Sequence, residues 1–94
     1  AGLWESWKNP EGDLVRSCTI VTTRPNEFIA PIHNRMPVIL SQETEALWLD
    51  PMTEEASTLN PLLIPSPSEG LDSYVVSSLV NSPKNSGSEC IVPV

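Results

Sequence analysis

The chain has little of what metal and redox sites are built from. Its 94 residues include one histidine and two cysteines, and Cys18 and Cys90 lie too far apart in the sequence to act as a ligand pair. A single histidine cannot complete a zinc site with them, so the sequence predicts no metal. Nothing in the sequence indicates an oxidising compartment, and we expect both cysteines to be free thiols of a cytoplasmic protein.

Glycine and long apolar runs are also scarce. The four glycines form no phosphate-binding loop, and no serine lies in a Gly-x-Ser-x-Gly context, which excludes P-loop enzymes and serine hydrolases of that type. No apolar run approaches the ~20 residues of a membrane span, and no basic segment precedes an apolar one as in a signal peptide. We therefore expect no cofactor and no membrane partner.

Positive charge is scarce too, because five Lys and Arg face twelve Asp and Glu, for a net charge of −7. Taken alone, this charge counts against binding to nucleic acid or to an anionic membrane. The distribution is uneven, however. The first third of the chain is near neutral, and the acids from Glu43 onwards have the composition of a solvated outer face. The cations of that first third are Lys8, Arg16, Arg24 and Arg35.

What the sequence does contain is a pattern of short strands. Residues 1–8 alternate between two faces, residues 9–13 hold turn-forming Pro and Gly, and residues 14–23 are rich in β-branched and apolar side chains on both faces. This pattern predicts a hairpin that is covered on two sides. We also expect a buried strand over residues 37–40 and a third long strand over residues 71–80.

Capping residues mark short helices between these strands. Ser41 predicts a helix over residues 42–49, and Asn26 predicts a short helix over residues 27–30. The inward face of the longer helix is expected to carry Thr44, Leu47 and Trp48.

Thr53 is expected to cap one more short helix that ends at Leu59. The fold class is therefore α+β and predominantly β, in one domain over residues 1–94. Because the chain opens on Ala1 in the middle of a strand pattern and not on methionine, we expect a fragment that is incomplete at its N-terminal side.

The only histidine lies in the segment Ile32-His33-Asn34-Arg35-Met36-Pro37. An imidazole and a guanidinium two residues apart suit chemistry on an anionic ligand. Arginine binds phosphate or carboxylate through paired hydrogen bonds, and a nearby cation favours the neutral imidazole that can transfer protons. The alternatives are a structural histidine and an arginine in a surface ion pair.

Three residues outside this segment are further candidates. Glu5 lies among apolar residues of a strand, and desolvation favours the proton transfer expected of a general acid or base; a glutamate at a strand edge in water is the alternative. Thr22 ends a strand just before the histidine loop, where its hydroxyl can bind a ligand. Trp4 can stack on a base or pack in the core.

Five motifs follow one another along the chain, namely Ala-Gly-Leu-Trp-Glu at 1–5, Ser-Cys-Thr-Ile-Val-Thr-Thr at 17–23, Ile-His-Asn-Arg-Met-Pro-Val-Ile-Leu at 32–40, Trp48-Leu49 and Val80-Asn81. They occur in the order found in the SOS-response-associated peptidase (SRAP) family, and the chain closely resembles the C-terminal half of that family over essentially its whole length. The resemblance implies an SRAP-type mixed β-sheet domain, barrel-like with short helices.

The resemblance implies an abasic-site sensor. Members of the family trap abasic sites in single-stranded DNA as a thiazolidine crosslink, made by the amine and thiol of an N-terminal cysteine. By this resemblance Glu5 is an acid/base beside the cysteine amine, and His33 assists opening of the deoxyribose ring. Arg35 contacts a DNA phosphate, and Thr22 lines the pocket. Apart from the resemblance, Trp4 is assigned to DNA binding as a side chain that can stack on a base, with packing in the core as the alternative.

One departure from the family is large. Its N-terminal cysteine lies in a half that this chain lacks, and neither Cys18 nor Cys90 replaces it, because neither has a free α-amine. We therefore expect the chain alone to be inactive. The expected partners are single-stranded DNA with abasic sites and the missing half or another chain, in the bacterial cytoplasm at the nucleoid or in a eukaryotic nucleus.

Two other functions stay open. The chain can be a non-catalytic half-domain that serves as a binding or assembly module, completed by another chain. A true peptidase rests on the family's name and its self-processing of the start methionine, and no residue here argues for cleavage of other proteins.

Overall fold

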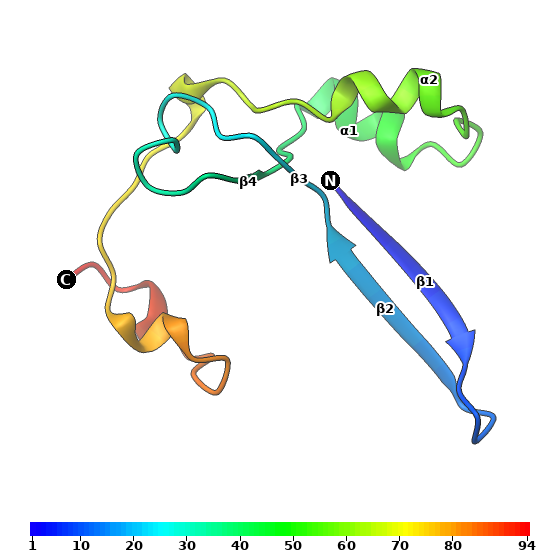
Figure 1. The fold of residues 1–94 in the computed structure, drawn as a ribbon, viewed down its shortest axis with the longest axis horizontal. Helices are drawn as coiled ribbons and strands as arrows, with labels where there is room; N and C mark the ends of the chain where they lie inside the picture. The colour runs from blue at the N-terminus through cyan, green and yellow to red at the C-terminus, as the bar shows by residue number, and fades with distance from the viewer.

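The computed structural model describes all residues from 1 to 94, as short elements joined by long irregular segments (Figure 1). It is a mixed α+β fold in which strands outnumber α-helices, as the sequence predicts. The strands are β1 (Gly2–Lys8), β2 (Leu14–Ile20), β3 (Thr22–Thr23) and β4 (Met36–Pro37), and the α-helices are α1 (Gln42–Leu49) and α2 (Ala56–Leu59). Four short 3₁₀ helices follow, η1 (Asn60–Leu62), η2 (Ser68–Gly70), η3 (Ser78–Asn81) and η4 (Ser88–Ile91).

The predicted hairpin is confirmed. β1 and β2 pair antiparallel in a register that runs from Gly2 opposite Ile20 to Lys8 opposite Leu14. At the tip, Gly12 has a φ of +88°, a left-handed conformation that glycine adopts without the steric cost of a Cβ atom. Turn chemistry therefore sets the register of the hairpin, as the Pro and Gly of residues 9–13 indicate.

The expectation that this hairpin is covered on two sides is wrong. Figure 1 shows the two strands projecting away from the helices, and no helix packs along them. Glu5 is accordingly exposed, and its apolar neighbours do not desolvate it. The large apolar side chains that the hairpin exposes, with their exposed fractions, are Leu3 (58%), Trp4 (71%), Trp7 (51%), Leu14 (59%) and Ile20 (66%).

The packed part of the molecule is a junction at the base of the hairpin, formed by Ala1 and residues 21–38. The N–H of Val21 donates to the carbonyl of Ala1, and the N–H of Val38 donates to the carbonyl of Val21, each at 2.9 Å. β3 pairs antiparallel with β4 beside these bonds. Three of the chain's four buried residues lie here, namely Thr23, Met36 and Val38.

This junction corrects two predicted boundaries. The strand expected over residues 14–23 breaks at Val21. The Val21 N–H still bonds Ala1 in the register of the hairpin, but its carbonyl accepts from Val38, which lies beyond the hairpin. The strand expected over residues 37–40 begins earlier and ends at Pro37, the last residue of β4. Val38 is nevertheless the most completely buried side chain, 1% exposed.

Helix α1 has the predicted bounds. The Oγ of Ser41 accepts a hydrogen bond from the N–H of Thr44, as an N-cap should. On its inner face, Trp48 donates its indole N–H to the carbonyl of Gly2 at 3.1 Å, which ties the helix to the start of β1. The half-buried residues of α1 are Thr44, Leu47 and Trp48, as predicted.

Two predictions about the second half of the chain are wrong. Thr53 does not cap α2; Glu55 precedes that helix, and the Thr53 hydroxyl donates to the Asp50 carboxylate at 3.2 Å. Residues 71–80 form no long strand and contribute a single bridge, between Val76 and Pro93. A β-branched sequence favours a strand only where a neighbouring strand is there to pair with it, and none runs alongside this segment.

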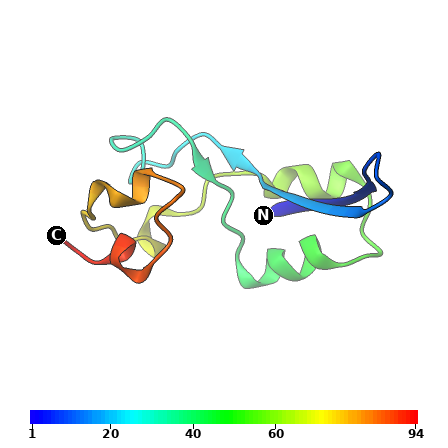
Figure 2. The ribbon, with the colours of Figure 1, turned by 90° about the horizontal axis from the view of Figure 1, so that it is seen from below.

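The chain is extended for its size. Its radius of gyration is 16.9 Å, whereas a compact domain of this length has about 12 Å. Figure 2 shows the C-terminal turns at one end and the hairpin tip at the other. No helix has the length and apolar character that crossing a membrane requires.

Candidate functional site

The loop that carries His33 is organised by Asn26. The Asn26 side-chain oxygen accepts from the N–H of Ile29, and its amide nitrogen donates to the carbonyl of Ser66, each at 2.9 Å. The predicted helix over residues 27–30 is a hydrogen-bonded turn, not a helix, and Ile29 accepts from the N–H of His33 at 2.9 Å. A polar cap residue thus shapes the loop and presents His33 at its exposed end.

His33 is held through one ring nitrogen. The main-chain N–H of Arg35 donates to Nδ1 of His33 at 3.0 Å, so Nδ1 carries the lone pair and the proton of a neutral ring is assigned to Nε2. Nδ1 also lies 3.1 Å from the Arg35 carbonyl oxygen, but a nitrogen that accepts cannot donate there. The Nε2–H group is left to act on a ligand.

Arg35 is held at its side chain by Thr22. Nη2 of Arg35 donates both to the carbonyl oxygen of Thr22 at 2.9 Å and to its Oγ1 at 3.0 Å. A guanidinium has five N–H donors in a fixed plane, so Nε and Nη1 remain for an anion. The partner of Arg35 is therefore β3 and not one of the chain's many carboxylates.

Glu5 and Trp4 lie apart from this group, on the hairpin. Glu5 pairs with Ser17 and Trp4 with Cys18, and because successive residues alternate, the two side chains point to opposite faces. The Glu5 carboxylate accepts from the N–H of Ser6 at 3.0 Å. The structure thus brings together His33, Arg35 and Thr22 and leaves Glu5 and Trp4 separate from them.

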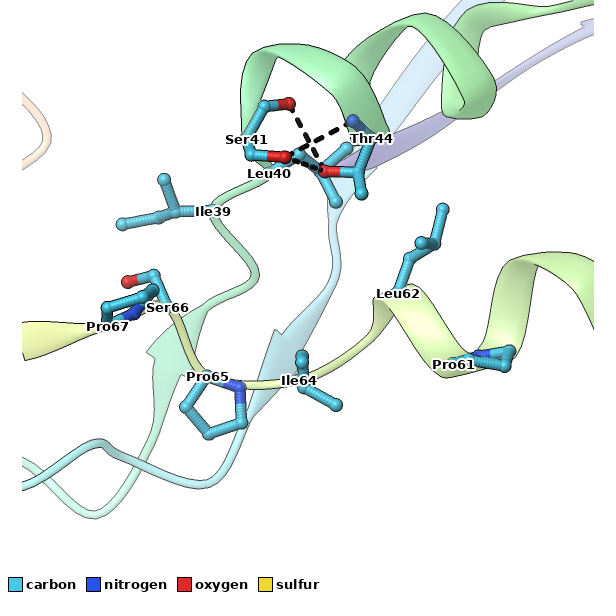
Figure 3. A pocket seen from close by; sticks show the side chains of 10 residues that line it. All are labelled: Ile39, Leu40, Ser41, Thr44, Pro61, Leu62, Ile64, Pro65, Ser66 and Pro67. Atoms are coloured by element: carbon cyan, nitrogen blue, oxygen red, sulfur yellow. Dashed lines mark hydrogen bonds between the residues drawn. The ribbon is translucent and has the colours of Figure 1, made fainter.

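The best-formed pocket lies elsewhere. It has a volume of about 230 Å³ and lies between the start of α1 and residues 61–67 (Figure 3). Its polar groups are largely occupied, since the hydroxyls of Ser41 and Thr44 bond each other at 2.9 Å; a buried exception is the Ser66 hydroxyl, which has no partner. None of the five candidate residues lines this pocket, which is therefore separate from the candidate site.

The structure brings no three His, Cys, Asp or Glu side chains together in a way that could hold a metal ion. Cys18 is an exposed free thiol on β2, and Cys90 is a buried free thiol in η4. The groups that the candidate site brings together are the imidazole of His33, the guanidinium of Arg35 and the hydroxyl of Thr22.

Two contacts that shape the site were not foreseen from the sequence. One is the bond from Trp48 to Gly2, which fixes the start of the strand that carries Glu5. The other is the clasp of Arg35 by Thr22. A tryptophan on the inner face of a helix signals a donor that needs a partner, but no local pattern tells which carbonyl it meets.

Comparison with known proteins places the chain in a family. A model of the family described as "SOS response associated peptidase (SRAP)" matches residues 1–83. The abasic site processing protein YoqW of Bacillus subtilis (strain 168) is 50% identical over 91 residues, which are 97% of this chain and 41% of that protein. The abasic site processing protein HMCES of Pongo abelii is 38% identical over 96 residues, covering 100% of this chain and 27% of that protein.

A solved structure agrees with the fold. The X-ray crystal structure of a protein from Bacteroides thetaiotaomicron superposes with a TM-score of 0.77 at 28% identity, over 99% of this chain and 42% of the other. The chain thus spans less than half the length of the relatives and the structure that it matches. On the family model and the identity to these relatives, the chain belongs to the SRAP family.

Proposed function

We propose that these 94 residues supply the proton-transfer and phosphate-contact part of an SRAP domain that captures abasic sites in single-stranded DNA. The target is supported by the relatives YoqW and HMCES, which are named as abasic site processing proteins. The single observation that carries the proposal is the state of His33. Its Nδ1 is occupied by the Arg35 N–H, so Nε2 is free to act beside a guanidinium with unused donors.

The chemistry proposed is formation of a thiazolidine. A cysteine α-amine condenses with the open-chain aldehyde of the abasic sugar to an imine with loss of one water. The thiol then adds to the imine carbon, and its proton goes to the nitrogen. Cys18 and Cys90 lie within the chain and have no free α-amine, so this cysteine comes from polypeptide outside the 94 residues.

Each site residue has one role in this scheme. His33 donates a proton from Nε2 to the ring oxygen as the sugar opens, and Glu5 accepts a proton from the attacking amine. Arg35 holds a DNA phosphate, and Trp4 stacks on a base of the single strand. For Glu5 and His33 to serve one reaction, the hairpin and the loop must face a common cleft in the completed domain.

The test is crosslinking by the full-length protein to single-stranded DNA with one abasic site. His33→Ala and Glu5→Ala should each slow formation of the crosslink by about a hundredfold, the usual contribution of general acid/base catalysis. Glu11→Gln, an exposed glutamate of the hairpin turn, is the matched control and should react at the unchanged rate. Wild-type rates for both alanine variants would rule out this assignment.

A second function has its own observation. The chain exposes 7,694 Å², about 2,300 Å² more than a compact monomer of 10.3 kDa. An excess of this size is comparable to a stable protein interface. We therefore keep as an alternative that the chain is a non-catalytic assembly module, completed by the remainder of the domain or by another chain.

The two functions differ in what the completed domain does with DNA. An assembly module folds on its partner but shows no preference for abasic over intact single-stranded DNA, and no dependence on His33. The abasic-site function requires both. Competition between the two DNAs for the full-length protein, followed by the yield of covalent product, separates them.

A further inference from the structure

Thr22 offers two oxygens to one nitrogen of Arg35. Its main-chain carbonyl and its Oγ1 accept from Nη2 at 2.9 and 3.0 Å, across 13 positions of sequence. The resemblance to the family assigns Thr22 to the lining of the ligand pocket. The geometry instead directs both of its free acceptors toward the arginine.

We propose that Thr22 is a positioning residue, whose carbonyl and hydroxyl oxygens fix the Arg35 guanidinium so that Nε and Nη1 face a DNA phosphate. This inference rests on the proposed function, because it takes Arg35 as a phosphate contact. It departs from the role that the family resemblance implies for Thr22, because it gives Thr22 no DNA contact of its own.

Thr22 is held in place by the pairing of β3 with β4. Thr22 belongs to β3 and pairs with Pro37 in β4, and the next residue, Thr23, is one of the four buried residues of the chain. Arg35 is by contrast exposed, and a free arginine side chain loses rotamer entropy when it is immobilised. Because Thr22 on β3 already holds the guanidinium in the free protein, less of this entropy is lost when DNA binds.

Arg35 is held at its other end as well. Its main-chain N–H donates to Nδ1 of His33, so the backbone and the side chain of this one residue are both fixed. Loss of the Thr22 hydroxyl would leave the guanidinium with one of its two hydrogen bonds to Thr22, while the bond from the Arg35 main chain to His33 remains. The phosphate contact should therefore weaken, and the proton-transfer step should not.

Three variants isolate the hydroxyl. Thr22→Val keeps the shape of the side chain and the carbonyl acceptor but removes Oγ1, whereas Thr22→Ser keeps Oγ1. Thr58→Val makes the same change at an exposed threonine of α2 that has no hydrogen-bond partner for its hydroxyl, and serves as the matched control.

Binding is measured separately from chemistry with the full-length protein and single-stranded DNA that carries a tetrahydrofuran abasic analogue, which has no aldehyde. Arg35→Ala should weaken binding about tenfold, and lower the slope of log K against log salt by about 0.7, the loss of one phosphate contact. Thr22→Val should weaken binding about threefold. Thr22→Ser and Thr58→Val should bind like the wild type.

The double variant Thr22→Val/Arg35→Ala decides the mechanism. If Thr22 acts through Arg35, the double variant binds as Arg35→Ala alone does, because the clasp has nothing left to hold. Additive losses would mean that Thr22 contacts DNA directly and would overturn the inference, as would wild-type binding by Thr22→Val. Wild-type binding by Arg35→Ala would overturn the phosphate contact of the proposed function and this inference with it.

Discussion

The hairpin and the junction that follows it use their residues in opposite ways. β1 and β2 form seven cross-strand pairs but bury no side chain. The junction has only the two pairs of β3 and β4, yet it holds Thr23, Met36 and Val38. One region has backbone pairing without a core, and the other has a core with little pairing.

The difference shows that strand pairing and burial are separate requirements. Cross-strand bonds satisfy the backbone, and their net contribution is small because water satisfies the same groups in the unfolded chain. Burial of apolar side chains provides the larger driving force for folding, and the apolar side chains of the hairpin are not buried in this chain. We therefore expect substitutions in the junction to lower the free energy of unfolding the most. Substitutions in the hairpin should lower it only in a completed domain that covers the hairpin.

The strongest test of the comparison is Val38→Ala. Val38 is 1% exposed, and loss of its two methyl groups should lower the free energy of unfolding by about 2.5 kcal/mol. Val75→Ala, at a valine that is 75% exposed, should change it by less than about 0.5 kcal/mol. Urea denaturation of the full-length protein measures both. Equal values would mean that the junction is not the core.

The next test asks whether the hairpin gains a cover. In the full-length protein, Ile20→Ser should cost about 2 kcal/mol of unfolding free energy, as for a buried isoleucine, although Ile20 is 66% exposed in this chain. Met52→Ser, at a methionine 87% exposed, is the control and should cost little. If Ile20→Ser leaves the unfolding free energy unchanged, the hairpin is exposed in the full-length protein too, and its contrast with the junction holds there as well.

Trp48→Phe tests the tie between the helix and the hairpin. The substitution removes the indole N–H that donates to Gly2, and should lower the unfolding free energy of the full-length protein by about 1.5 kcal/mol. Faster hydrogen exchange at the start of β1 should accompany this loss. Leu49→Ala, at an exposed neighbour on α1, should leave that exchange unchanged; matching exchange in both variants would contradict the role of the bond.

The smallest effect is expected at the hairpin tip. Gly12→Ala forces a Cβ atom onto a residue with φ of +88° and should cost about 1 kcal/mol. Gly70→Ala is the control, because no atom lies within 4 Å of its added Cβ and its φ is not positive. Thermal denaturation compares the two. A neutral Gly12→Ala would mean that the tip, unlike the junction, adapts without strain.

Local signals in the sequence predicted the elements that depend on local chemistry. Ser41 and the apolar spacing after it gave the bounds and the inner face of α1, and Pro10 and Gly12 gave the turn of the hairpin. Residues 71–80 carry an equally strong β pattern and form no long strand, because pairing depends on a partner strand that no local pattern specifies. The same holds for the cover expected over the hairpin.

Three of the residues proposed from the sequence, His33, Arg35 and Thr22, lie together in the structure, and their contacts follow only partly from the sequence. The contact of His33 with Arg35 follows from their spacing of two residues, which lets the main-chain N–H of Arg35 reach the imidazole ring of His33. The contact of Arg35 with Thr22 joins residues 13 positions apart and depends on how β3 and β4 align. The role of Glu5 stays a prediction, since it depends on a cleft to which both the hairpin and the loop would belong.

Asn26 has a mechanical consequence for the whole chain. Its side chain closes the His33 loop through Ile29 and at the same time grips the carbonyl of Ser66, 40 positions away. The N–H of Phe28 donates to Oγ of Ser68 at 3.3 Å, so two hydrogen bonds, one of them from the Asn26 amide, join the loop to the C-terminal segment. Conversion of that amide to a carboxylate, as in slow deamidation, keeps the acceptor for Ile29 but sets an oxygen against the Ser66 carbonyl. Deamidation would thus remove one of the two hydrogen bonds that connect the His33 loop to residues 66–68 and leave only the bond from Phe28.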